Sequence, residues 1–245
     1  MISFVGVAGF PDSSQLVEIE STAAGGHAVN AHGVGFIAGL ASPAGDRTIA
    51  GLARVASDAG IPNANVLRVS CFYERADQVE TARSAIASTF PAAGASFVNS
   101  YALSASPAIE CEAVARLAAD PSSPKQYFNR PLVPASPNYS QAALVATRFV
   151  VFPRAESAES ATKSDMHAML DRAKVDVAQY GASLADVVMG DNYWLTGAAR
   201  DTMRVVRAQY FGGVVPAATG VFFTSLLPAN ASAAIELVVA ADSSA

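Results

Sequence analysis

The stretch from Tyr180 to Leu195 reads YGASLADVVMGDNYWL, and a counterpart of it lies earlier in the chain. Together the two stretches indicate the fold. Between residues 58 and 74 the sequence reads DAGIPNANVLRVSCFYE. In both stretches a glycine ends an apolar helical pattern and is followed by a short polar connection and a strand-like run. Because glycine accepts the left-handed backbone at a helix end without steric cost, each stretch predicts a helix stop and then a β-strand.

The same order of predicted helices and strands flanks each of these two strands. Helical periodicity predicts helices over residues 46–59 and 76–90 in the first half, and over 160–180 and 199–211 in the second. Each half ends in a similar strand-like run, IECEAVA from Ile109 and IELVVAA from Ile235. The order of strands and helices predicts an α+β unit in which two helices cover one face of a mixed sheet.

The spacing between matching positions indicates a duplication. Three matching pairs are 121 residues apart, and a fourth pair of glutamates is 124 apart. The pairs are Gly60 and Gly181, Val66 and Val187, Phe90 and Phe211, and Glu112 and Glu236. A constant offset with one short slip is typical of a repeated unit. We therefore expect one domain over residues 1–120, a proline- and serine-rich linker over 121–136, and a second domain over 137–245.

Composition limits the classes of partner. Of 245 residues 51% are hydrophobic and 15% charged, which is typical of a compact globular chain. No apolar run approaches the ~20 residues of a spanning helix, so no membrane segment is expected. The formal charge of −5 argues against nucleic acid as a partner, since phosphate binding needs clustered basic residues. The opening MISFVGVAGF lacks a basic region, so we expect a strand there, not a signal peptide, and a cytoplasmic location.

The cysteines and histidines do not suggest a metal site or a cofactor. Cys71 and Cys111 are far apart in the sequence and fit no CxxC pair, so buried free thiols in a reducing cytosol are expected. The three histidines, His27, His32 and His167, have no metal-ligand spacing. Nucleotide-binding and serine-hydrolase motifs are absent from the sequence. We therefore expect neither metal nor cofactor.

Several segments carry a resemblance to a known family. In the second half they are PNYSQAALVATRFVVF from Pro137, YGASLADVV from Tyr180, PAATGVFF from Pro216 and LPANASAAIEL from Leu227. In the first half GFIAG from Gly35 and IECEAVA are collinear with them. Each half resembles the RidA/YjgF family of enamine and imine deaminases. The resemblance implies two tandem chorismate-mutase-like domains, a trimeric homo-oligomer, and a small-molecule site in the cleft between adjacent domains.

The resemblance also implies roles for particular residues. The family glutamate that positions the hydrolytic water corresponds to Glu236, and Glu112 takes that position in the first half. Tyr139 corresponds to a tyrosine that lines the cleft. The arginine that holds the substrate carboxylate in the family is replaced by Ala218, and in the first half by a residue near Ala95. Both halves thus retain the acid and lack the cation.

Other residues are candidates for substrate binding. Asn192 and Trp194 could form a hydrogen-bonding aromatic wall for a flat conjugated ligand, although packing in the core is the alternative for Trp194. Thr219 could donate a hydrogen bond to a ligand. Arg148 could replace the missing arginine. Arg130 and Lys125 are the alternatives to Arg148, and each of the three could equally be an exposed solubilising charge.

The sequence therefore predicts a small-molecule deaminase or hydrolase that acts on an enamine, an imine or a conjugated amino acid of the aminomuconate type. Glu236 would orient the water. One alternative is a chorismatase-like or lyase-like enzyme acting on a cyclic carboxylate. Another is a non-catalytic ligand-binding or assembly protein of the same fold. A structure can distinguish these functions by what fills the cleft around Glu236.

Overall fold

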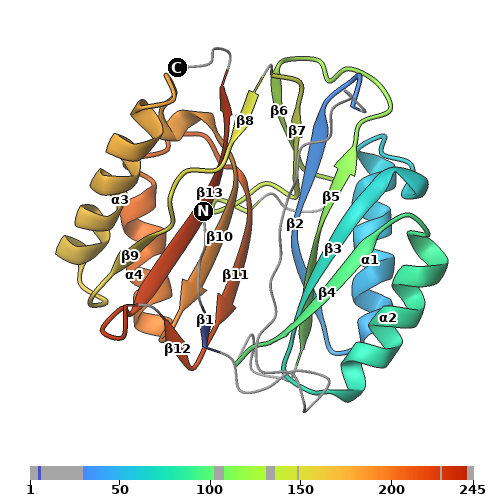
Figure 1. Cartoon of the computed structure of the whole chain (residues 1–245), viewed down its shortest axis with the longest axis horizontal. Helices are drawn as coiled ribbons and strands as arrows, with labels where there is room; N and C mark the ends of the chain where they lie inside the picture. Colours follow the sequence, from blue (N-terminus) through green and yellow to red (C-terminus); the bar gives the residue numbers. More distant parts are fainter. Residues whose placement is uncertain are drawn as a thin grey trace.

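The computed structural model describes residues 5–6, 30–101, 108–130, 136–147, 149–226 and 228–241. The chain forms two mixed sheets that face each other, and each sheet is covered on its outer side by two helices (Figure 1). The molecule therefore has four layers, helix–sheet–sheet–helix. This is the α+β architecture expected from the sequence, with two helices on one face of each sheet.

The first sheet has the strand order β4-β3-β5-β2-β7-β6. Its central strands alternate with two helices along the chain: β2 (Val34–Ser42), α1 (Gly45–Asp58), β3 (Val66–Tyr73), α2 (Asp77–Thr89), β4 (Gly94–Asn99) and β5 (Ile109–Arg116). A short 3-10 turn, η1 (Asn63–Asn65), leads into β3. β3 runs parallel to β4 and antiparallel to β5, which makes the sheet mixed.

The second sheet repeats this order. Its elements are β8 (Phe149–Val151), β9 (Glu156–Ala158), α3 (Lys163–Ala178), η2 (Leu184–Asp186), β10 (Val187–Trp194), α4 (Gly197–Arg207), β11 (Ala217–Phe222) and β13 (Ala233–Ala241). β10 is parallel to β11 and antiparallel to β13. Gly60 and Gly181 follow α1 and α3 with φ of 75° and 68°, so both glycines occupy the left-handed conformation expected of helix stops.

The connection between the halves contains regular structure. β6 (Lys125–Phe128) lies within the segment expected as a linker, 121–136, and pairs with β7 (Ala142–Val145). β7 was expected in the second unit, but it pairs with β2 of the first sheet. The division of the chain at 120 and 137 stays a prediction, whereas hydrogen bonding of the first sheet continues to residue 145.

Four apolar regions hold the layers together. One core lies between the first sheet and its helices and a second between the other sheet and α3 and α4. The third region joins the two sheets, where Phe36 and Val145 pack with Met189 and Val238. A further inter-sheet cluster brings Phe72 against Phe223, with the ring centroids 6.3 Å apart. Burial of apolar surface thus fixes how the two sheets face each other.

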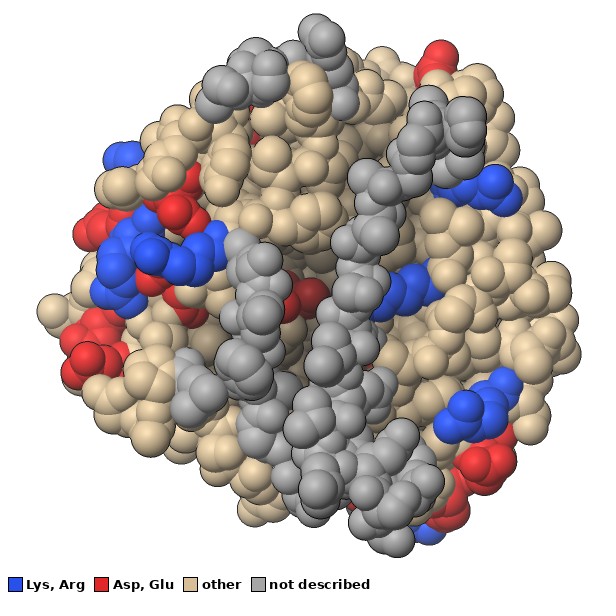
Figure 2. Space-filling model, viewed as in Figure 1, with Lys and Arg blue, Asp and Glu red and all other residues tan. Residues whose placement is uncertain are grey.

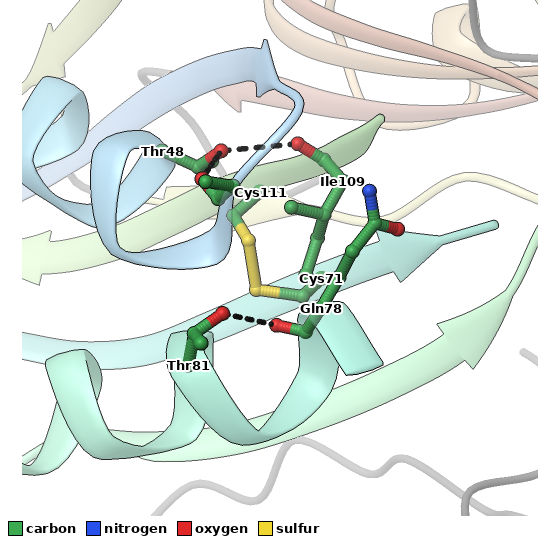
Figure 3. The surroundings of a disulfide bond; sticks show 7 residues. Thr48, Cys71, Gln78, Thr81, Ile109 and Cys111 are labelled. Carbon is green, nitrogen blue, oxygen red and sulfur yellow. Dashed lines mark hydrogen bonds between the residues drawn. A yellow bond between two sulfur atoms is a disulfide. The ribbon is translucent and has the colours of Figure 1, made fainter. Parts of the chain in front are cut away.

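The two cysteines form a disulfide, which corrects the expectation of free thiols (Figure 3). Cys71 on β3 and Cys111 on β5 are direct partners in the antiparallel register, and their Cα atoms are 4.1 Å apart. Their separation of 40 residues concealed this contact, because the strand pairing brings them together through the fold. Both lie in the first core. A structural disulfide is rare in a reducing cytosol, so the cytoplasmic expectation loses one of its premises.

Two further points concern the chain ends and membranes. Of the opening segment expected as a strand, the structure describes β1 (Val5–Gly6), which pairs with β12 (Ser225–Leu226). The rest of that segment lies outside the described residues. Within the described part of the chain, no helix combines the length and apolar character that crossing a membrane requires.

Candidate functional site

The strand register brings three polar residues side by side on the second sheet. Asp191, on the central strand β10, is paired with Thr219 on β11 and with Glu236 on β13. The first sheet has the same arrangement at matching positions, where Ser70 on β3 is paired with Ser96 on β4 and Glu112 on β5. Since directly paired residues project from the same face, each sheet carries a polar ladder across three strands.

Both ladders face the opposite sheet. Phe72 lies two residues beyond Ser70 on β3, and Tyr193 lies two residues beyond Asp191 on β10. Both of these aromatic residues belong to an inter-sheet apolar cluster. Because side chains alternate along a strand, Ser70 and Asp191 share those faces. The polar ladders therefore lie in the space between the sheets, with apolar clusters on either side of them.

Three hydrogen bonds connect the two sheets across this space. The Thr219 hydroxyl donates to Glu112 Oε2, and the same oxygen of Thr219 accepts a bond from the Gly39 backbone N–H at 3.1 Å. The Gly220 N–H donates to Glu110. A Cβ at Gly39 would lie 2.1 Å from Glu110 Oε1, so a larger residue there would displace the Glu110 carboxyl. The second sheet therefore supplies donors to two carboxyls of the first.

Four carboxyl groups meet here, and we call Glu110, Glu112, Asp191 and Glu236 the inter-sheet acidic cluster. Burial raises the pKa of Glu110 to about 8, and the Glu112 charge adds to the effect while the Gly220 N–H opposes it. The pKa of Asp191 is raised well above its usual range by burial first, then by the charges of Glu112 and Glu236. Glu110 is therefore protonated near neutral pH, and its surroundings also favour the protonated form of Asp191.

Polar groups from both sheets complete the cluster. The Tyr193 hydroxyl donates to Glu236 Oε2 at 3.0 Å. Burial, followed by the charges of Asp191, Glu236 and Glu112, raises the pKa of Tyr193, so it remains a neutral donor. Arg68, from β3 of the opposite sheet, lies close enough to Asp191 to oppose the rise in its pKa. The charge of a cation from the first half thus acts on a carboxyl of the second.

The structure brings some of the candidate residues together and separates others. Glu236, Glu112 and Thr219 all lie in or beside the acidic cluster. Tyr139 packs against the apolar residues between the sheets. Arg148 lies outside the described residues. The alternatives to Arg148, Lys125 and Arg130, form ion pairs elsewhere.

Asn192 and Trp194 lie on the other face of β10, toward α3 and α4. Asn192 Nδ2 donates to the backbone oxygens of Gly190 and Thr219, both at 2.9 Å, and Trp194 is buried in the second core. Neither contributes to the polar ladder. Lys125 and Arg130 are occupied by Asp186 and Asp58 respectively.

Four residues in or around the acidic cluster were not singled out as site residues from the sequence: Asp191, Tyr193, Glu110 and Arg68. A signal for Asp191 was present, because the 121-residue offset aligns it with Ser70 beside the matching pair Glu112 and Glu236. Nothing in the sequence pairs Arg68 with Asp191, since that proximity depends on how one sheet packs on the other.

Figure 2 shows a few acidic atoms set back from the surface near the middle of the view. Within the described part of the chain, no three His, Cys, Asp or Glu side chains are arranged to hold a metal ion. The raised pKa values of Glu110 and Asp191 make the acidic cluster a candidate for proton transfer.

No family model and no curated protein matches the chain. A solved YjgF/YER057c/UK114 family member from Mycobacterium tuberculosis is 25% identical, covers 42% of this chain and 86% of its own, and has a TM-score of 0.35. A Rid-family protein of unknown function from Yersinia pestis is 18% identical, with coverage of 49% and 100% and a TM-score of 0.44.

A third solved structure, TdcF of E. coli with bound serine, is 18% identical, covers 40% of this chain and 84% of its own, and has a TM-score of 0.36. Each of these solved chains thus covers less than half of this chain and most or all of its own length. The solved structures to which the chain is similar are YjgF and Rid proteins at low sequence identity.

Proposed function

We propose that the chain is a hydrolase of small imines, enamines or conjugated amino acids of the aminomuconate type, with its active site at the inter-sheet acidic cluster. The observation that supports this proposal is the combination of a carboxyl with a raised pKa, Asp191, directly paired with a second carboxyl, Glu236. Neighbouring titratable groups in different environments are typical of acid and base roles.

The two carboxyls would have separate roles. Glu236, oriented by the Tyr193 hydroxyl, would take a proton from water as the water oxygen bonds to the imine carbon. Asp191 would donate its proton to the imine nitrogen. The resulting amino alcohol would collapse to a carbonyl compound and ammonia, so that one water is consumed for each carbon–nitrogen bond cleaved. General acid and base groups of this kind contribute roughly 10²- to 10⁴-fold each to a rate.

Arg68 would hold a carboxylate on the substrate. The resemblance to RidA places that function at Ala218, which cannot provide it, whereas Arg68 lies beside Asp191 from the other sheet. A charge-assisted hydrogen bond contributes about 1.5–3 kcal/mol. The anchor would thus come from the opposite half, and a substrate longer than 2-iminopropionate is expected to span from Arg68 to Glu236.

The test is release of ammonia by the purified protein from a panel that runs from 2-iminopropionate to aminomuconate-type compounds. Glu236→Gln and Asp191→Asn should each lower turnover by roughly 10²- to 10⁴-fold. Glu159→Gln, at an exposed glutamate, is the matched control and should leave turnover unchanged. Turnover that survives Glu236→Gln would refute the assigned role of this residue.

A second candidate is a non-catalytic ligand-binding or assembly protein. The observation that favours it is the apolar packing on both sides of the cluster, which closes the two sheets on each other. This function predicts no ammonia from any compound in the panel, together with a ligand that co-purifies with the wild type. Cyclic carboxylates belong in the same panel, because product formation from them would instead indicate lyase-like chemistry.

We further propose a homo-oligomer, with a trimer expected from the resemblance to RidA. Light scattering of the purified chain measures this directly. A mass of about three chains is expected, and a monomer would restrict the site to the cleft within one chain.

A further inference from the structure

Away from the acidic cluster, the first half has a hollow of about 280 Å³ that is lined by three arginines. It lies between the end of β2, one face of α1, and Arg130 and Gln141, which lie just after β6 and just before β7. The lining residues are Leu40, Ala41, Ser42, Arg47, Thr48, Gly51, Arg54, Val55, Arg130 and Gln141. No carboxylate is among them. We propose that this hollow binds a small, multiply charged anion, such as a phosphate ester or a polycarboxylate.

The helix positions its two arginines for a shared ligand. Arg47 and Arg54 are seven residues apart on α1, so they project from the same face two turns apart. Gly51 lies between them on that face and contributes no side chain. A Cβ there would be 3.4 Å from Leu40 Cδ1, an ordinary contact, so packing does not require glycine. Glycine inside a helix costs about 1 kcal/mol relative to alanine, and here it leaves the space between the guanidinium groups open.

The charges in the hollow are not balanced within the part of the chain that the structure describes. Arg130 is paired with Asp58. Neither Arg47 nor Arg54 has a side-chain hydrogen bond or ion pair with any described residue. Guanidinium groups bind carboxylates and phosphates through paired hydrogen bonds, and two of them on one face match an anion with several oxygens.

Gln141 adds a neutral donor to the same hollow. Its side-chain oxygen accepts a bond from the Arg130 backbone N–H at 2.8 Å, which leaves the amide nitrogen as the free end of the side chain. Thr48 is not available, because its hydroxyl donates to backbone oxygens of Ala44 and Ile109. The ligand would therefore be held by two guanidinium groups from α1, with Arg130 and Gln141 at the other wall.

Isothermal titration at low ionic strength with inorganic phosphate, pyrophosphate and citrate tests the proposal. Wild type should bind at least one of these anions, and Arg47→Gln and Arg54→Gln should each raise its Kd at least tenfold, which is the loss of about one charge-assisted bond. Gly51→Leu, which fills the space but retains both charges, should also weaken binding. Preference for pyrophosphate over citrate would identify a phosphoryl ligand, and the reverse a polycarboxylate.

Lys174→Gln is the matched control, because it removes one exposed positive charge from α3, far from the hollow in sequence and in fold. Its Kd should stay within twofold of wild type. The proposal is overturned if none of the three anions binds to wild type, or if the arginine variants bind as tightly as the Lys174 control. Glu236→Gln should retain full anion affinity, so this result is separable from the outcome for the acidic cluster.

Discussion

The two sheets present the same three strands in the same register but differ in chemistry at matching positions. The first ladder is Ser96, Ser70 and Glu112, and the second is Thr219, Asp191 and Glu236. In the central position the first half has the Ser70 hydroxyl and the second half has the Asp191 carboxyl. The second half therefore holds the pair of acids to which we assign the proposed hydrolysis, while the first half supplies Glu112, Glu110 and the cation Arg68.

The opposite faces of the same strands also differ. Cys71 and Cys111 of the first half match Asn192 and Ile235 of the second, at offsets of 121 and 124. A covalent bond links the strands in one half. In the other half the Asn192 amide bonds to backbone oxygens of its own strand and of β11. The disulfide and the Asn192 hydrogen bonds both link strands whose other face carries a polar ladder, but the covalent bond is the stronger link.

The largest effect is expected from making the second ladder like the first. Asp191→Ser would remove the proposed proton donor, so ammonia release should fall by roughly 10²- to 10⁴-fold. The midpoint of thermal unfolding should not fall, because the substitution also removes a buried carboxyl from a crowded acidic cluster. Ser70→Ala in the first ladder is the comparison, and its turnover should stay within a few-fold of wild type. Equal losses in both variants would remove the distinction between the halves.

The next effect concerns the covalent link. Replacing both Cys71 and Cys111 with alanine should lower the free energy of unfolding by about 2–4 kcal/mol, because the disulfide closes a long loop in the unfolded chain. Urea denaturation with and without reductant measures this. Reductant should destabilise the wild type and leave the double variant unchanged. If reductant has no effect on the wild-type midpoint at equilibrium, the disulfide contributes nothing to stability.

Much of the fold follows from local signals in the sequence. The glycine stops, the helical periodicity and the constant offset predicted four helices, and α1 to α4 begin and end within a few residues of them. β6 was missed because its four residues lie among prolines and serines, where the sequence pattern predicts a loop. Its pairing with β7 is a tertiary contact that no local periodicity records.

The site was less predictable, because its residues meet across two sheets. Alternation along a strand correctly places Glu236 on the opposite face of the strand from its apolar neighbours. It cannot identify which residues of the other sheet lie against that face. Arg68 and Asp191 become neighbours only when the sheets pack. The same reason explains the missed disulfide, since Cys71 and Cys111 meet only through the register of β3 with β5.

A further effect is expected from pH, and it tests the acidic cluster without an assay of turnover. Glu110 ordinarily titrates at 4.5 and does so at about 8 in the folded chain. Between these values the folded state binds the additional proton, so rising pH favours unfolding. Stability should therefore fall by about 1.4 kcal/mol per pH unit through this window for this group alone.

Glu110→Gln should flatten that slope and make the variant more stable than wild type at pH 8, because a neutral amide needs no proton to remain buried. Its oxygen can still accept the Gly220 N–H. Urea midpoints measured from pH 5 to pH 8 give the slopes, and Glu159→Gln should retain the wild-type slope. An unchanged slope in the Glu110 variant would place the protonated carboxyl elsewhere in the cluster, with Asp191 the next residue to test.

The smallest effect comes from the helix N-termini, where the halves again differ. Thr196 caps α4 in an extended conformation and accepts a bond from the Ala199 N–H at 3.2 Å, whereas Ala44 before α1 has a similar conformation and no side-chain cap. Thr196→Ala should cost about 1 kcal/mol in urea denaturation. Ala44→Ser should gain less than that, because Asp46 already accepts the bond from the Arg47 N–H at 2.8 Å. If Ala44→Ser stabilises the chain by as much as Thr196→Ala destabilises it, the Asp46 side chain does not act as a cap for α1.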